Sequence, residues 1–308
     1  MNFAASFRRS SRCSKERDRR GAARSERGWA LVSVLWTVTM LALMAAATEA
    51  LTVTSYVGER HAMTDAEADA DLDAAVARAV LGISDLRPEQ RWRVDGAVRT
   101  FVFEGRSVRI AVQDETGRID LNAASGALIR QLLMGEGVTP EDASRLADNI
   151  VDWRSTTGLQ SLNGATGADY QAAGLSYRPR HGPFQTVDEL KLVLGMTPAL
   201  FARIRPALTV YSKRAMFDSS VAPREALLAL YPNDPGKIDT ILRAREGDPN
   251  MAMRPGFAPG AIVSLSAPGG RAFSIAAEVA IGRRTFRRDA VVELSGDDKR
   301  PYFVLAWR

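Results

Sequence analysis

One long apolar run dominates the hydrophobic pattern of this chain. Between Arg27 and Glu49 no side chain carries a charge, and this length matches the ~20 apolar residues that a membrane-spanning helix needs. We therefore expect one helix over residues 29–85, with a transmembrane part at 29–51, that ends before Pro88. Beyond the span, apolar positions recur at the three- and four-residue spacing of one helix face: Ala68, Leu72, Ala75, Val76, Ala79, Val80 and Ile83.

Farther along, apolar and polar positions alternate in two separate regions, as they do in half-buried strands. In the first region, residues 86–116, the pairs Asp95-Gly96 and Glu104-Gly105 have the composition of turns between short antiparallel strands. In the second region, residues 256–308, four strands are expected: Ala261–Leu265, Phe273–Ile281, Thr285–Leu294 and Tyr302–Trp307.

The intervening residues 117–255 have helical spacing and helix-capping residues. Thr139 is followed by a proline and two acidic residues, which is typical of a helix start, and the helix is expected over Glu141–Arg154. The polar stretch Ser155–Gly182 has no period and predicts a loop. Further helices are expected to start at Thr186 and Thr197.

The helical region contains a weak internal repeat. The segment Ile119–Leu133 is echoed by Phe217–Leu230, and each copy is followed by a linker and a second helix, Glu141–Arg154 and Lys237–Arg245. Duplicated helical units are expected to stack on a shared core. Strands on both sides of this region predict a sheet into which an all-helical domain is inserted.

Charge is concentrated before the apolar run. Residues 1–28 carry nine Lys and Arg against three acidic residues, and the remaining chain has 32 basic and 33 acidic side chains. Since basic flanks stay in the cytoplasm, we expect the N-terminus to face inward and the domain after the span to face outward. The pI of about 9.6 therefore reflects the leader rather than a DNA-binding patch. A cleaved signal peptide ending near Ala45-Ala46-Ala47 is an alternative that this pattern leaves open.

The residue inventory excludes several kinds of chemical site. Cys13 is the one cysteine and lies in the leader, so the outer domain cannot form a disulfide. With only His61 and His181 in the chain, a histidine-rich zinc site is excluded. The sequence has no glycine-rich phosphate loop with Lys-Ser/Thr and no His-Glu-x-x-His motif. We therefore expect a protein that is not an enzyme, without cofactor or small-molecule substrate.

The start of the apolar run resembles the processing site of type IV pilins and type II secretion pseudopilins. A basic leader is followed by Gly28 and an apolar helix. The resemblance implies cleavage by prepilin peptidase after Gly28 and methylation of the new N-terminal residue, Trp29. Most members carry glutamate at the fifth mature position, where this chain has Ser33. The minor pseudopilins of the general secretion pathway protein K family commonly lack that glutamate.

Motifs along nearly the whole mature chain also resemble the protein K family. They are Gly117–Asn122, Leu146–Arg154, Ala168–Tyr170, Val187–Leu190, Gly195-Met196 and Ala222–Leu228. The resemblance implies an α+β fold: a long N-terminal transmembrane and amphipathic helix packs on an antiparallel pilin-like sheet, which carries a large inserted all-helical domain, SAM-like or helix-hairpin-helix-like. The implied domains are a removed leader (1–28), the helix (29–85), a first sheet part (86–116), the helical domain (117–255) and closing strands (256–308).

The same resemblance implies where the protein works and with what. We expect a single-pass protein of the inner membrane with its C-terminal domain in the periplasm, at the tip of the type II secretion pseudopilus. It would initiate pseudopilus assembly with other minor pseudopilins and support protein secretion across the outer membrane. The inner-membrane secretion platform and prepilin peptidase are the other expected partners, and no nucleic acid is expected.

Two alternatives depend on single motifs. Ile119–Ser125 is similar to the opening of helix-hairpin-helix modules in competence-type DNA-binding proteins, but Glu136 lies where such a module would hold a phosphate. Asp152 and Asp169 are candidate calcium ligands, because family members often carry an acid-rich loop in this region. Here the loop after Arg154 lacks most of those carboxylates, which argues against tight calcium binding.

Overall fold

The structure is a computed structural model that describes residues 14–85, 87, 90–247, 270–297 and 299–308. Its contacts divide the chain into two units, Met1–Glu67 and Ala68–Arg308, and each is described separately. The first unit contributes most of helix α1 (Ser14–Ile83). This helix begins earlier than expected, inside the basic leader, and it ends at Ile83.

No other part of the first unit that the structure describes packs against the apolar part of α1. Trp29–Ala47 is the one segment in the described ranges that is long and apolar enough to cross a membrane. None of it is buried, and large side chains such as Trp29 and Leu35 are exposed. A helix that is apolar on all sides is stable when lipid or other protein surrounds it. The expected span at 29–51 agrees with this segment over its first 19 residues.

The second unit is built on an antiparallel sheet with the order β1-β2-β5-β6-β7. Its strands are β1 (Asp95–Phe103), β2 (Arg106–Asp114), β5 (Ala272–Ile281), β6 (Arg284–Asp297) and β7 (Arg300–Trp307). The expectation of a mixed α/β protein with an apolar N-terminal helix and an antiparallel sheet is therefore confirmed. The first of the four strands expected in residues 256–308, Ala261–Leu265, lies outside the described residues.

One expected turn is wrong. Asp95-Gly96 does not separate two strands but forms the start of β1, where the register with β2 shifts between Asp95 and Val98. Gly96 has a φ of +83°, which glycine adopts without steric cost. The composition that favours a turn here produces a β-bulge instead. The turn at Glu104-Gly105 connects β1 to β2 as expected.

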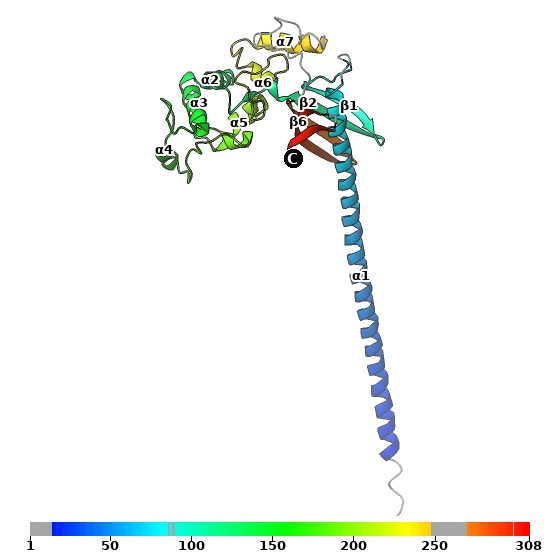
Figure 1. Ribbon diagram of the computed structural model, residues 1–308. Coiled ribbons are helices and arrows are strands. Elements are labelled where there is room, and N and C mark those ends of the chain that lie inside the picture. The colour runs from blue at the N-terminus through cyan, green and yellow to red at the C-terminus, as the bar shows by residue number, and fades with distance from the viewer. Residues whose placement is uncertain (1–13, 86, 88–89, 248–269, 298) are drawn as a thin grey trace, which may run out of the picture. The chain divides into compact units, whose positions relative to one another are not determined.

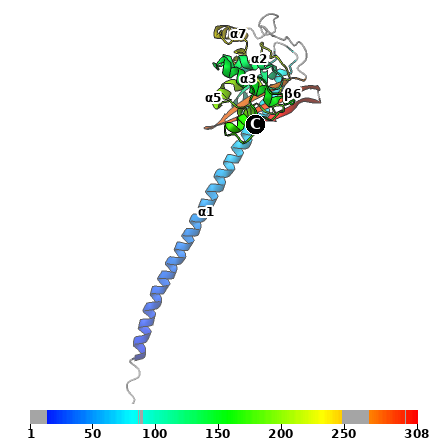
Figure 2. The same cartoon turned by 90° about the vertical axis from the view of Figure 1, so that its left-hand side faces the viewer.

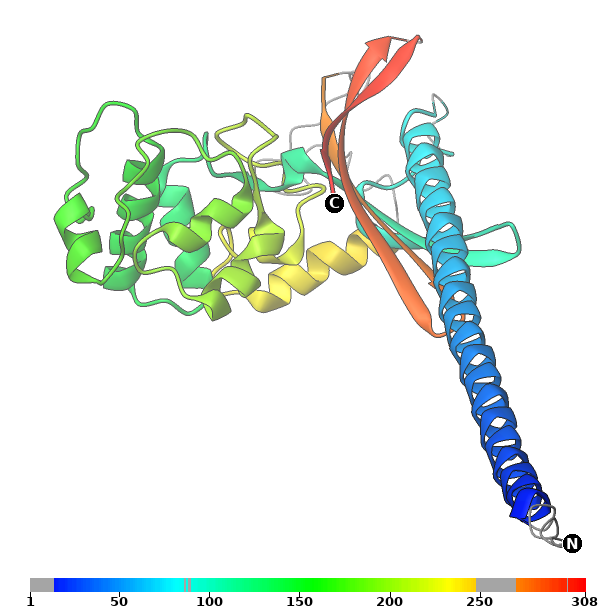
Figure 3. The ribbon, with the colours of Figure 1, turned by 90° about the horizontal axis from the view of Figure 1, so that it is seen from below.

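The two faces of the sheet pack against different parts of the chain. Residues of α1 from Ala68 to Ile83 cover one face, where they bury Ile110 on β2, Ile275 on β5 and Val292 on β6. The opposite face looks toward the helices inserted between β2 and β5. Figure 3 shows the strands passing between these helices and the cyan end of α1.

Residues 115–247, called here the helical block, follow β2 and precede the described start of β5. Its elements are η1 (Glu115–Gly117), β3 (Ile119–Asp120), α2 (Gly126–Gly135), α3 (Pro140–Arg154), α4 (Gly167–Ala172), η2 (Val187–Leu192), α5 (Pro198–Ile204), η3 (Arg205–Ala207), β4 (Leu208–Thr209), α6 (Arg224–Leu227) and α7 (Pro235–Gly247). Helices α2 and α3 lie side by side (Figure 1, Figure 2). The block has an apolar core of its own, separate from that under the sheet.

Several helix predictions are confirmed and several are wrong. Thr139 caps α3 by accepting a hydrogen bond from the backbone N–H of Asp142, as expected. Within the predicted loop Ser155–Gly182, however, Thr166 and Asp169 form a capping box that starts the short helix α4. Thr186 opens a helix with a capping box, as expected, and this helix is a 3₁₀ helix. In the region expected to be helical, β3 is a two-residue strand that pairs in parallel with β4.

The internal repeat has a local structural counterpart. Asp120 and Asp218 are both buried, and in each case the carboxylate accepts the backbone N–H two residues farther along, that of Asn122 or Ser220. These side chains form the same Asx turn before a helix. The helices that follow differ in length, because α2 has 10 residues and α6 has four. The boundaries expected at 117 and 255 stay predictions, and residue 255 lies outside the described residues.

A buried ion pair joins α1 to the sheet. Asp71 is fully buried in the helix, and Arg106 donates from Nε and Nη2 to its two carboxylate oxygens at 2.5 and 3.0 Å. A bidentate arginine–carboxylate pair fixes both distance and orientation. It therefore sets how the end of α1 sits on β2.

We predict that Asp71→Asn lowers the free energy of unfolding by about 2–4 kcal/mol, since it replaces the buried, charge-assisted contact between Asp71 and Arg106 by a neutral one. Arg109→Gln is the matched control: its pair with Glu278 is exposed and measures 3.4 Å, so its loss should cost less than about 1 kcal/mol. Urea unfolding of the detergent-solubilised chain measures both. Equal effects of the two substitutions would contradict the role given to Asp71.

Candidate functional site

The three residues expected to govern processing and assembly lie close together on α1. Gly28, Trp29 and Ser33 fall within one helical stretch, and Trp29 is 79% exposed. The Ser33 hydroxyl donates a hydrogen bond to the carbonyl oxygen of Ala30 at 2.9 Å. This hydroxyl is thus satisfied inside its own helix. It brings no charge into the apolar segment.

The two candidate calcium ligands are engaged by protein donors. Asp152 is buried, and its carboxylate accepts the backbone N–H of Ser161 at 3.0 Å and the Ser161 hydroxyl at 2.6 Å. Asp169 accepts the N–H and hydroxyl of Thr166, both at 2.7 Å, and these hydrogen bonds lower the pKa of its carboxyl. Among the described residues no three His, Cys, Asp or Glu side chains gather as a metal site would require. These carboxylates hold the loop that follows α3.

Residues of the family-like motifs tie loops to the helical core. Asn122 exchanges two hydrogen bonds with the backbone of Phe184, at 2.9 and 2.7 Å. Asn149 donates to the carbonyl of Leu194 and accepts the N–H of Ala165. A side-chain amide paired with backbone on both atoms fixes a loop that has no regular hydrogen bonding of its own. The motifs therefore have a structural role here.

One glycine of these motifs is required by close backbone approach. A Cβ on Gly117 would lie 2.6 Å from the carbonyl oxygen of Val221. Residues 117 and 221 meet where the chain leaves the sheet, and Gln113 there donates to the same Val221 carbonyl at 2.8 Å. Any larger residue at 117 would push these segments apart.

The hairpin between α2 and α3 does not offer free amides to a phosphate. The N–H groups of Glu136, Gly137 and Val138 all donate to carbonyls of the last turn of α2. The Glu136 carboxylate pairs with Arg203 at 3.0 Å. A helix-hairpin-helix site needs such amides to point at the ligand, and here they close the helix end.

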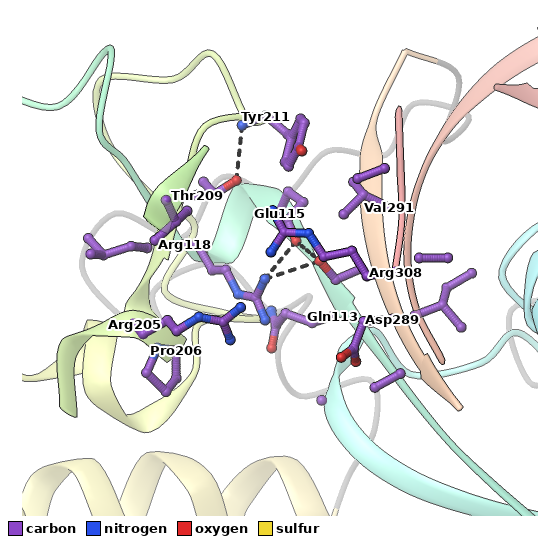
Figure 4. A pocket seen from close by; sticks show the side chains of 18 of the residues that line it. Gln113, Glu115, Arg118, Arg205, Pro206, Thr209, Tyr211, Asp289, Val291 and Arg308 are labelled. Atoms are coloured by element: carbon purple, nitrogen blue, oxygen red, sulfur yellow. Dashed lines mark hydrogen bonds and ion pairs between the residues drawn. The ribbon is translucent and has the colours of Figure 1, made fainter. Parts of the chain in front are cut away.

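A cavity of about 340 Å³ lies between the helical block and the sheet face opposite α1 (Figure 4). Its sheet wall includes Ala111 on β2, Ala276 on β5 and Val291 on β6, and its other wall comes from η2, η3 and β4. This size is typical of a small ligand site or of a recess for a few side chains. We call it the interdomain pocket.

A charged network lies on one side of the interdomain pocket. Glu115 is 1% exposed, and Arg118 donates from Nη1 to its carboxylate at 2.8 Å. The same Nη1 also donates to the Ser274 hydroxyl at 3.1 Å, which in turn donates to Glu115. Figure 4 shows these contacts as dashed lines. Because Ser274 belongs to β5, the network joins the helical block to the sheet.

A second charged link crosses the pocket mouth. Asp188 on η2 accepts from Lys191 at 2.6 Å and from Arg308 at 3.1 Å. These cations, Lys191 first, hold the pKa of the Asp188 carboxyl below its ordinary value of 3.8. Arg308 follows β7, where its backbone exchanges hydrogen bonds with Asp289. The Asp188–Arg308 pair is thus a second tie between block and sheet.

The sequence analysis missed the interdomain pocket. Its four arginines follow no common spacing in the sequence: Arg118, Arg205, Arg287 and Arg308. The one signal available was Arg118, which stands inside the Gly117–Asn122 motif.

Comparison with known proteins identifies the domain that holds these features. Residues 109–213 match the family described as Type II secretion system (T2SS), protein K. The chain carries a type II secretion system protein K domain. The matched region begins on β2 and runs through the block to just beyond β4, so it includes the Asn122 and Asn149 contacts and most of the helical wall of the pocket.

Relatives named Type II secretion system protein K support the same family. The protein of Pseudomonas aeruginosa is 27% identical over 179 residues, which are 54% of this chain and 51% of that protein. The protein of Klebsiella pneumoniae is 27% identical over 175 residues, 51% of this chain and 53% of that protein. That of Dickeya chrysanthemi is 31% identical over 111 residues, 35% of this chain and 30% of that one. The matches span about half the length of the first two relatives.

A solved structure has a fold similar to that of this chain. A chain of the GspK–GspI–GspJ complex from enterotoxigenic Escherichia coli superposes with a TM-score of 0.59 at 15% identity. The superposition covers 81% of this chain and 98% of that chain. At this identity the likeness concerns the fold.

We predict that Asp188→Asn lowers the midpoint of thermal unfolding at pH 7 by about 1–3 °C. Since the folded state lowers the pKa of Asp188, the stabilisation is present above its ordinary value of 3.8 and is lost as pH falls below it. The variant should therefore lose less stability than the wild type as the pH falls below about 4. Asp289→Asn is the control, because the Asp289–Arg287 pair lies within β6. An unchanged pH profile in Asp188→Asn would refute the link.

Proposed function

We propose that this protein is a minor pseudopilin of a type II secretion system that sits at the tip of the pseudopilus. It initiates assembly together with other minor pseudopilins and so supports protein secretion across the outer membrane. It is anchored in the inner membrane by a single helix, with the N-terminus in the cytoplasm and the domain after the span in the periplasm. Its other partners are the inner-membrane secretion platform and prepilin peptidase, and it needs no cofactor.

The observation that carries this proposal is the protein K domain on a chain whose N-terminal helix is apolar over Trp29–Ala47. An apolar helix of spanning length can anchor the folded domain in the membrane before assembly. The same helix can leave the membrane with the domain when the subunit enters a fibre. The similar fold of a chain in the GspK–GspI–GspJ complex supports other minor pseudopilins as partners.

Ser33 supports a place at the start of the fibre. In the family that this chain resembles, glutamate at this position is thought to pair with the N-terminal amine of the subunit added before. An unpaired charge in the bilayer is costly, so the pairing favours docking. Ser33 offers a hydroxyl that is already bonded to Ala30. The subunit has no charge with which to dock onto an earlier amine, while its own Trp29 amine can receive a neighbour's glutamate.

The helical block is a second reason to place this subunit at the tip of the fibre. It joins the sheet where β2 ends and before β5 starts, and Asp114 and Phe273 at those ends are direct partners in the sheet. The chain thus leaves the sheet and returns to it at one point, and the segment between holds some 130 residues of helix and loop. A bulk of this size beside the sheet would obstruct another subunit added above it.

The competence-type DNA-binding alternative gains no support. The family that matches is protein K. The backbone N–H groups of residues 136–138 already donate hydrogen bonds to carbonyls of α2. In the described part of the chain, the buried amides of the motifs, Asn122 and Asn149, hold loops in place.

The processing step gives the first test of the proposal. Mass spectrometry of the protein from its native membrane should find Trp29 as the N-terminal residue, with a methyl group on its amine. The basic leader, Gly28 and the apolar helix are the features that prepilin peptidase would require. Detection of an intact Met1, or of cleavage near Ala47, would refute pilin-type processing and with it this function.

The place in the assembly gives the second test. Quantitative labelling should find one or a few copies per fibre at the tip, and Ser33→Glu should change this little. Deleting residues 117–255 should let the protein enter the shaft, because residues 256–271 can still connect the adjacent ends of β2 and β5. Retained detergent solubility and strand content by circular dichroism serve as the folding control. Labelling of the unmodified protein along the whole fibre at major-subunit stoichiometry would show the tip assignment to be wrong.

A further inference from the structure

The interdomain pocket holds guanidinium donors that the described residues leave unused. The Nε of Arg118 is buried and has no hydrogen-bond partner there. The nearest carboxylate oxygen to Arg205 is Oδ2 of Asp188 at 4.0 Å, which is beyond hydrogen-bonding distance. Both side chains line the pocket (Figure 4). The buried Arg118 donor lacks a protein acceptor among the residues that the structure describes, and the half-exposed Arg205 guanidinium can bind an acceptor that enters the pocket.

The acidic residues of the pocket wall already accept hydrogen bonds from protein side chains. Glu115 accepts from Arg118 and Ser274. Asp188 accepts from Lys191 and Arg308, and Asp289 pairs with Arg287. An occupant must therefore bring its own acceptor oxygens. A planar carboxylate matches the fork of an arginine better than any neutral group does.

The rest of the lining indicates what carries that carboxylate. Ala111, Ala276, Val291 and Ala306 give the sheet wall small apolar side chains, on which an aliphatic stem can pack. The volume of about 340 Å³ admits a few side chains but not the surface of a folded domain. The occupant is thus an aspartate or glutamate on a protruding segment.

The pocket is also placed so that a bound segment does not compete with α1. Its strand residues Ala111, Ala276 and Asp289 are cross-strand neighbours and face away from Ile110, Ile275 and Ala290, which pack under α1. We propose that the interdomain pocket binds an acidic side chain on a protruding segment of a partner pseudopilus subunit. This rests on the proposed function, which supplies the class of partner.

The test places a photo-crosslinking amino acid at Pro206 in the full-length protein, expressed in its native membrane with the other secretion proteins. Pro206 lines the pocket beside Arg205. After irradiation, mass spectrometry should map the crosslink to a membrane-anchored subunit, within a few residues of an Asp or Glu. Adding Arg205→Glu should reduce the crosslink roughly tenfold or more, as expected for one lost charge-assisted contact.

The matched control is Arg178→Glu. Arg178 is an exposed arginine of the same helical block, outside the pocket lining, and makes no hydrogen bond or ion pair with the described residues. This substitution changes the net charge equally and should leave the crosslink unchanged. Replacing the mapped acid by lysine should weaken the crosslink of the unsubstituted chain and restore that of Arg205→Glu.

Three results would overturn the pocket assignment: no crosslink from position 206, a crosslink to secreted cargo or to a segment without acid, or no rescue by the charge exchange. Co-purification of the other minor pseudopilins is measured in the same preparations. If they co-purify while the pocket results fail, the proposed function stands and the pocket assignment falls. If they do not co-purify with the unsubstituted chain, the proposed function itself is wrong.

Discussion

The pairing of β2 with β5 is the constraint on which the second unit depends. Seven residue pairs, from Val108 with Val279 to Asp114 with Phe273, join strands that the whole helical block separates in sequence. Closing so long a loop costs conformational entropy before any contact forms. The pairing is favourable because Ile110 and Ile275 are buried under α1 at the same time. Sheet and helix therefore stabilise each other.

This pairing makes the helical block an insertion with a core of its own. Few contacts then remain to fix the block on the sheet, and they are polar. Asp218 donates its N–H to the Thr116 carbonyl at 2.7 Å, Gln113 reaches Val221, and Arg308 reaches Asp188. Two separately packed bodies joined by a few polar ties leave a space between them. The interdomain pocket is that space.

The family motifs have their effect inside the block rather than on its surface. Asn122 and Asn149 hold loops by paired backbone contacts, while Trp153 stacks on Phe184 with ring centroids 6.3 Å apart. Such residues preserve a shape. The likeness of residues 109–213 to the protein K family therefore concerns residues that hold the fold together.

The sequence alone determined the elements with strong local signals. The charge-free run before Glu49, the spacing from Ala68 to Ile83 and the Thr139 cap each specify local structure through hydrophobic pattern or a single hydrogen bond. The turn signal of Asp95-Gly96 was misread, because the pairing of β1 with β2 overrides the local preference. Only the tertiary structure brought together Arg118, Arg205 and Arg308, since their proximity results from β2 meeting β5 and leaves no periodic trace along the chain.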